Sequence, residues 1–206
     1  MSTTDSPSTV IEHVVLFKVK DNTDPSKVNA IFTGFNGLIS LDQVLHLTTG
    51  PLVRIRSPLS NFTHMFHSRY YSKEDLSAYS THPSHLALVG ETFSICDDIM
   101  VVDWVAADFQ GLVVPPAGSA MRVTFLKLKE KVSEEGKNEV LRVIKGIKES
   151  IGDMDQITCG ESEGVFDCFA GSFPWIEGNG GRRFQGGADA FAQRKGWGLF
   201  GGRDCG

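Results

Sequence analysis

The order of the apolar patterns between His13 and Val105 constrains the fold of this chain more than any other feature. Alternation of β-branched and aromatic residues with polar ones predicts a strand, whereas apolar residues spaced by three and four predict a helix. These patterns predict strands over residues 13–20, 41–47, 62–70 and 99–105, and helices from about residues 25 and 73. The order β-α-β-β-α-β is that of a ferredoxin-like unit. We therefore predict an α+β fold in which two helices cover one face of an antiparallel sheet.

The same pattern starts a second time after Pro115-Pro116. The segment RVTFLKLK at 122–129 matches HVVLFKVK at 13–20, including both lysines. Farther along, Asp155-Gln156-Ile157 parallels Asp42-Gln43-Val44, and Gly160 takes the place of Gly50. A repeat of this length is too long for a solenoid and indicates a duplicated domain.

The second copy stops before it is complete. Twelve of the 22 glycines follow Glu161, and the apolar period disappears there. Two hypotheses account for this tail: out-of-frame translation of a normal second domain, or a genuine glycine-rich extension. The predicted segments are a disordered N-terminus (1–10), a complete domain (11–106), a linker (107–119), a partial second domain (120–161) and a tail without regular structure (162–206).

Composition excludes several classes of partner. The formal net charge is −5 without a cluster of Lys and Arg, whereas a nucleic-acid-binding surface is basic. No apolar run approaches the roughly 20 residues of a membrane-spanning helix. The four cysteines form no CxxC pair, so we expect reduced thiols and no zinc ribbon. Because the start MSTTDSPSTV does not resemble a signal peptide, we predict a cytoplasmic protein. We also predict no nucleic-acid partner, no membrane contact and no cofactor.

The six histidines all lie between His13 and His85, and four of them, His13 and His64 included, fall in predicted strands. In an alternating strand His13 shares a face with Phe17, and His64 shares a face with Phe66. We therefore expect both imidazoles on one sheet face, which would line a barrel and contact a substrate.

A second pair of candidates surrounds the turn His82-Pro83-Ser84-His85. Tyr79 precedes His85 by six residues, and the turn can bring the two side chains together. Histidine is the natural general acid or base near neutral pH, and a tyrosine hydroxyl can donate a hydrogen bond to a developing enolate. The alternative is a structural turn whose imidazoles bond local backbone groups. Since no third ligand stands at a suitable spacing from His82 and His85, no metal site is predicted.

Four segments resemble the plant stress-response A/B barrel (Dabb) domain: EHVVLFKVK, FTHMFHSRYYSKEDLSAY, YSTHPSH and DDIMVVDWV. The resemblance covers about residues 11–105 and, in half-length, 122–161, and it is greatest to members with two tandem domains. It implies a dimeric α/β barrel, in which two ferredoxin-like sheets from two chains or two domains face each other. Because the second copy is incomplete, we expect a homodimer through residues 11–105.

The resemblance implies three possible functions. The first is a stress-response protein without assigned catalysis. The second is a polyketide cyclase similar to olivetolic acid cyclase, in which His85 and Tyr79 would catalyse the aldol cyclisation of a linear polyketide while His13 and His64 bind the substrate. The third is a carrier that binds a lipophilic small molecule in the same cavity. Full-length tandem relatives can end in a peroxisomal tripeptide, but this chain ends Arg203-Asp204-Cys205-Gly206, so cytoplasm remains the prediction.

Overall fold

The computed structural model describes residues 8–56, 61–107, 109–128, 131–150, 154–162 and 165–174, which form two antiparallel sheets. The elements of the first half are β1 (Thr9–Val19), α1 (Pro25–Gly37), the 3-10 helix η1 (Leu38–Ser40), β2 (His46–Pro51), β3 (His64–Tyr70), α2 (Lys73–Ser80), α3 (Pro83–Ile95) and β4 (Cys96–Ala107). The elements of the second half are β5 (Ser119–Lys127), α4 (Glu134–Lys145), α5 (Ile147–Ser150), β6 (Ile157–Ser162) and β7 (Val165–Pro174).

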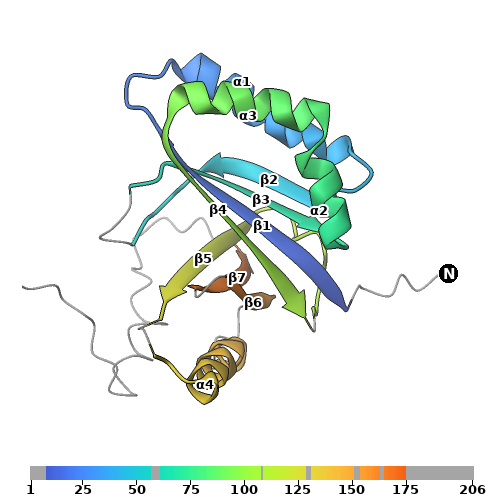
Figure 1. Ribbon diagram of the computed structural model, residues 1–206, viewed down its shortest axis with the longest axis vertical. Helices are drawn as coiled ribbons and strands as arrows, with labels where there is room; N and C mark the ends of the chain where they lie inside the picture. The colour runs from blue at the N-terminus through green and yellow to red at the C-terminus, as the bar shows by residue number, and fades with distance from the viewer. Residues whose placement is uncertain are drawn as a thin grey trace, which may run out of the picture.

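The first half has the ferredoxin-like topology predicted from its sequence. Its strands lie in the order β2-β3-β1-β4, and each neighbouring pair is antiparallel. The helices α1 and α3 contact each other and cover one face of this sheet (Figure 1). This arrangement confirms the predicted α+β fold.

The start of α1 follows directly from its sequence. The carboxylate of Asp24 accepts a hydrogen bond from the backbone N–H of Ser26 at 2.8 Å, and Pro25 occupies the first helical turn, where its missing N–H costs nothing. Ile31, Phe32 and Phe35 then recur on the face that the helix buries. None of the helices in the described ranges is both long enough and apolar enough to cross a membrane.

The predicted second strand, residues 41–47, is a strand only at its end. The chain turns after η1, where the Val44 N–H donates to the Leu41 carbonyl at 2.9 Å, and β2 begins at His46. Val44 is buried and Leu41 packs against the same core. Because the turn already buries both apolar side chains, an extended backbone would bury no further apolar surface here.

Alternation along β1 sends its side chains to two separate cores. Ile11, Val15 and Phe17 face the helices and pack with Phe32 and Phe35. The intervening residues face the opposite way, where a second core lies between the two sheets. Since β1 is paired on both sides and covered on both faces, its sequence is a nearly continuous run of apolar residues.

The second half repeats part of the first half's topology. Its strand order, β5-β7-β6, corresponds to β1-β3-β2 of the first half, with α4 following β5 as α1 follows β1. This correspondence supports the duplication that the sequence predicts.

Strand β7 corrects the prediction that the chain lacks regular structure from residue 162. Residues 165–174 pair with β5 on one side and with β6 on the other, in the place that β3 has in the first half. The sequence missed this strand because backbone pairing to two neighbours holds it in the sheet, rather than an alternating pattern of its own. Residues 175–206, and the reading-frame hypothesis that concerns them, lie outside the described residues.

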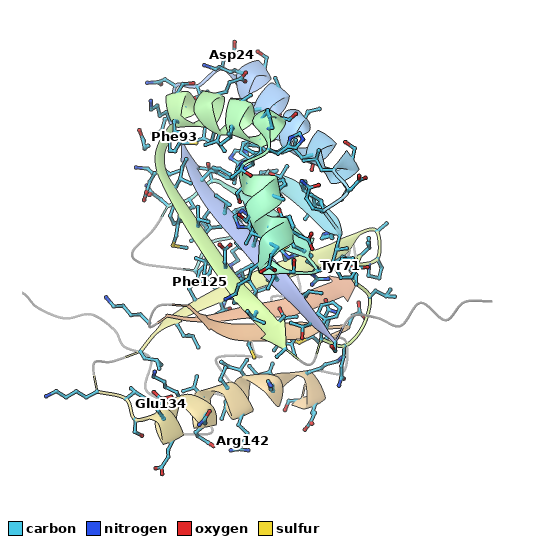
Figure 2. The ribbon with its side chains drawn as sticks, turned by 45° about the vertical axis from the view of Figure 1, so that its right-hand side comes forward. Asp24, Tyr71, Phe93, Phe125, Glu134 and Arg142 are labelled. Carbon is cyan, nitrogen blue, oxygen red and sulfur yellow. The ribbon has the colours of Figure 1, made fainter. Side chains whose placement is uncertain are left out.

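The second sheet covers the face of the first sheet that the helices leave bare. Val10, Val14 and Trp104 of the first sheet pack with Val123 and Phe125 of β5. Helix α4 lies on the outer side of the second sheet, so the layers run helix, sheet, sheet, helix (Figures 1 and 2). The predicted homodimer through residues 11–105 rests on the assumption that this face is bare. Since the chain covers the face itself, that reason does not hold, and the homodimer stays a prediction without it.

The boundaries of the predicted segments also shift. β1 begins at Thr9, inside the segment 1–10 that was expected to be disordered, while residues 1–7 lie outside the described residues. Ala107 belongs to β4 and Ser119 to β5, which shortens the predicted linker at both ends. This linker is attached to the first domain, because Phe109 is buried and its ring lies 5.1 Å from the guanidinium carbon of Arg69.

Candidate functional site

Three of the four predicted site residues meet between the first sheet and its helices. The ring centroids of Tyr79 and His85 are 4.5 Å apart, and those of His13 and Tyr79 are 6.4 Å apart. Two aromatic rings of β3 surround Tyr79, with Tyr70 at 5.3 Å and Phe66 at 6.3 Å between centroids. We call His13, Tyr79, His85, Tyr70 and Phe66 the histidine–tyrosine cluster.

A carboxylate at the edge strand β4 holds His13 in place. Nδ1 of His13 lies 2.5 Å from Oδ1 of Asp103, the residue directly opposite it in the β1–β4 ladder. His13 is 7% exposed, whereas the Asp103 side chain is about half exposed. The pair therefore leads from the buried cluster to the protein surface.

The turn at residues 82–85 combines a structural role with a chemical one. Nδ1 of His82 accepts a hydrogen bond from the Ser84 N–H at 3.2 Å and caps α3, so the structural alternative holds for this imidazole. Nδ1 of His85 donates to the Ser80 carbonyl at 2.9 Å, which leaves the lone pair on Nε2. Burial lowers the pKa of His85, so the imidazole is neutral near pH 7 and can accept a proton.

No described residue meets the geometry of a hydrogen bond with the Tyr79 hydroxyl, although the side chain is fully buried; the polar group that interacts with it is the neighbouring Tyr70 hydroxyl. Burial raises the pKa of Tyr79, so the hydroxyl keeps its proton and remains a donor. A buried polar group left unsatisfied costs about 1–3 kcal/mol. An acceptor brought to this point by a ligand would therefore recover free energy.

His64 lies at the other end of the aromatic layer. Its ring stacks on Phe32 at 4.5 Å between centroids, and Phe35 lies between this pair and His85. His64 also lines an open groove of about 340 Å³ between the end of β1 and the start of α1. Burial lowers the pKa of His64. The structure thus places His64 at an approach to the helix-side core rather than beside His13.

The predicted face of the histidines needs one correction. His13 and His64 do share a face, but it is the face beneath the helices and not the face opposite the second sheet. Alternation reveals which residues share a face, whereas the side on which the helices pack depends on the tertiary structure. Among the described residues, no group of three His, Cys, Asp or Glu side chains is placed to hold a metal ion.

The face opposite the second sheet carries a buried charged network that the sequence analysis missed. Glu12, His67 and Arg69 are each 0% exposed. The Glu12 carboxylate lies 2.6 Å from Nε2 of His67 and accepts a hydrogen bond from Nε of Arg69 at 3.1 Å. The available signal was the presence of charged residues inside two apolar strands, VIEHVV and MFHSRY, because charged side chains are buried only when they are paired.

The network joins the two halves of the chain. Nη2 of Arg69 donates to Oε1 of Gln156 at 2.7 Å, and its Nη1 donates to the Val113 carbonyl of the linker at 2.7 Å. The Thr158 hydroxyl donates to Oε1 of Glu12 at 3.0 Å. Gln156 belongs to the triplet that revealed the repeat, and it works here as a contact between the halves.

Acid is expected to lower the free energy of unfolding in two successive ranges of pH. Burial, together with the charges of His67 and Arg69, lowers the pKa of His46 to about 4, so between about pH 6.5 and 4 the unfolded chain binds a proton that the folded chain does not. Burial raises the pKa of Glu12, but His67 and Arg69 overcome this effect and lower the pKa to about 2. Below about pH 4.5 the unfolded chain therefore binds a second proton that the folded chain does not, and the free energy of unfolding falls further. After allowance for the partial exposure of His46, its share is at most about 2 kcal/mol.

Urea unfolding midpoints measured across this pH range test the prediction. His46→Gln should lower the pH dependence between about pH 6.5 and 4, leaving the part contributed by His64, His67 and His85, whose pKa values burial also lowers. Wild-type and His46→Gln curves with the same pH dependence would contradict it.

A known family matches the first domain, and known proteins match most of the chain. Residues 11–106 match the family model described as Stress responsive A/B Barrel Domain. Stress-response A/B barrel domain-containing protein DABB1 of Arabidopsis thaliana is 50% identical over 157 residues, 75% of this chain and 73% of that protein. A second stress-response A/B barrel domain-containing protein of the same plant is 50% identical over 163 residues, 79% of this chain but 62% of that relative, so the chain spans less than two thirds of the relative's length.

A solved structure resembles almost the whole chain. The crystal structure of a putative monooxygenase from Fusobacterium nucleatum has a TM-score of 0.62 and covers 92% of this chain and 87% of its own, at 15% identity. At that identity the likeness concerns the fold alone. It supports an arrangement of the two halves that extends beyond the first domain.

Proposed function

Because the chain belongs to the stress-response A/B barrel family, we propose that it acts in a stress response by binding a small apolar molecule that carries a carbonyl group. DABB1 and the second Arabidopsis relative are both named as stress-response proteins. The observation that carries the binding proposal is the buried Tyr79 hydroxyl, which has only the Tyr70 hydroxyl beside it and meets hydrogen-bond geometry with none of the described residues.

The surroundings of Tyr79 suit such a molecule. Its ring lies among those of Phe66, Tyr70, His13 and His85, so a ligand there meets apolar rings and few polar groups. A ligand carbonyl that accepts from Tyr79 would satisfy the hydroxyl. Since Tyr79 is fully buried, entry has to move side chains, and the half-buried His85 is the ring of the cluster that solvent reaches most readily.

Tyr79→Phe is expected to stabilise the protein alone and to weaken ligand binding. Removing a buried, unsatisfied hydroxyl should raise the free energy of unfolding by about 1 kcal/mol, while the lost hydrogen bond should weaken binding about tenfold. Urea unfolding measures the first effect, and titration calorimetry with a long-chain alkyl β-diketone measures the second. The control is Tyr71→Phe, which removes a hydroxyl from a side chain that is 59% exposed and should change neither quantity. Unchanged affinity in Tyr79→Phe would sink the binding proposal.

A second candidate function is the polyketide cyclase, and the geometry of His85 favours it. Its Nδ1–H is engaged by the Ser80 carbonyl, so Nε2 can take a proton from the carbon between two carbonyl groups. The Tyr79 hydroxyl, whose ring centroid lies 4.5 Å from that of His85, would donate to the enolate oxygen that forms. The carbanion would then attack a second carbonyl of the same chain and close the ring.

The variant His85→Gln separates the carrier from the cyclase. The glutamine amide can still donate to the Ser80 carbonyl, but it cannot act as a base. A cyclase should lose turnover of a linear tetraketide thioester by at least about a hundredfold, with binding retained. A carrier should bind the β-diketone equally well before and after the substitution, and the wild-type protein should leave the thioester unchanged.

A further inference from the structure

The pairing of β6 with β7 brings two cysteines to one position of the second sheet. In this antiparallel ladder Cys159 lies directly opposite Cys168. The chain has four cysteines, and these two are nine positions apart in the sequence with a strand reversal between them. No CxxC spacing marks the pair, so only the register reveals it.

The register gives a separation that a disulfide can span. Directly opposite residues of an antiparallel pair have Cα atoms about 4.5–5.5 Å apart. Disulfides form across Cα separations of about 4.4–6.8 Å. Opposite positions of a ladder also belong to the same face of the sheet, so the register assigns the two cysteine positions to one face.

That face is the outer one, toward α4. The Thr158 side chain faces the first sheet, where it bonds Glu12, and Gly160 approaches Trp104 on the same side. By alternation Cys159 lies on the opposite face, against which α4 packs (Figure 1). Cys159 is half-buried there, so a small oxidant can reach it more easily than it can reach a core residue.

We infer that Cys159 and Cys168 form an oxidisable pair, a modification site at which hydrogen peroxide makes a cross-strand disulfide. The thiolate of one cysteine attacks the peroxide, breaks its O–O bond and becomes a sulfenic acid while one water leaves. The second thiol displaces the hydroxyl of the sulfenic acid as a second water, which forms the S–S bond. Two thiols are oxidised and one peroxide is reduced to two waters. In a reducing compartment such a bond is transient and serves as a sensor.

The buried Cys96 provides the contrast. It lies at the start of β4 in the other sheet, and burial raises the pKa of its thiol, so little reactive thiolate is present. Oxidation should therefore select the pair on β6 and β7 and leave Cys96 reduced.

Treatment of the reduced full-length chain with stoichiometric hydrogen peroxide tests the inference. Thiols that react with an alkylating reagent should fall from four to two per chain, and peptide mapping should find Cys159 joined to Cys168. In Cys96→Ser the number of reactive thiols should fall from three to one, whereas peptide maps of Cys159→Ser and Cys168→Ser should contain no intramolecular disulfide, since each variant lacks one member of the pair. A map in which Cys159 or Cys168 pairs with a different cysteine, or a wild-type chain that keeps four thiols, overturns the inference. The thiol count and the peptide map both use the wild-type fold, so the conclusion does not depend on the folding of a variant.

Discussion

Replacing Glu12 by alanine is expected to lower the free energy of unfolding by about 3–5 kcal/mol, the largest effect of any substitution considered for this protein. The carboxylate bonds His67 and Arg69, and all three side chains are completely buried between the sheets. Removing it leaves the Arg69 guanidinium charged and without its counter-ion in a place that water does not reach. Such an uncompensated charge costs more than the original pair contributes. Urea unfolding followed by circular dichroism measures the loss.

Two matched variants show that the effect comes from the network. Glu91→Ala removes an exposed carboxylate from α3 and should change stability by less than about 0.5 kcal/mol. Thr158→Val removes one hydrogen bond to Glu12 from the second half of the chain and should cost about 1 kcal/mol. If Glu12→Ala costs no more than Glu91→Ala, the network does not hold the two halves together.

Replacing Gly160 by valine is expected to cost about 2–3 kcal/mol, because β6 approaches β4 too closely for a side chain. A Cβ atom on Gly160 would lie 2.6 Å from Cβ of Trp104 and 2.8 Å from its Cδ1. The nearest atom is next to the Trp104 backbone, so it cannot swing away as the end of a flexible side chain can. The two sheets would have to separate, which weakens the core between them. The unfolding midpoint in urea again measures the effect.

The repeat provides the control for this substitution. Gly50, the counterpart of Gly160 in the first half, has no atom within 4 Å of the place that a Cβ would occupy. Gly50→Val should therefore be close to neutral, although the two glycines are equivalent in the sequence. In a Trp104→Gly background, which removes the Cβ atom as well as the ring, the added cost of Gly160→Val should largely disappear, because the partner in the clash is gone. Equal costs of Gly160→Val in both backgrounds would refute the proposed contact.

Only part of the candidate site could be predicted from the sequence. Alternation and the spacing around the turn at 82–85 were enough to single out His13, Tyr79 and His85, because each signal lies within one element or one turn. Sequence could not show that the Ser80 carbonyl would accept a hydrogen bond from Nδ1 of His85, nor that the Tyr79 hydroxyl would meet hydrogen-bond geometry with none of the described residues. Those facts depend on how the helices pack against the sheet.

The sequence by itself determined the topology of the first half of this protein, although not the start of β2, because periods of two and 3.6 and helix caps are local properties. Only the tertiary structure decided which face the histidines occupy, that β7 completes a three-stranded sheet, and that Glu12 and Arg69 bind Thr158 and Gln156. These outcomes join residues far apart along the chain. Their free energies come from burial and hydrogen bonds that exist only once the two sheets face each other.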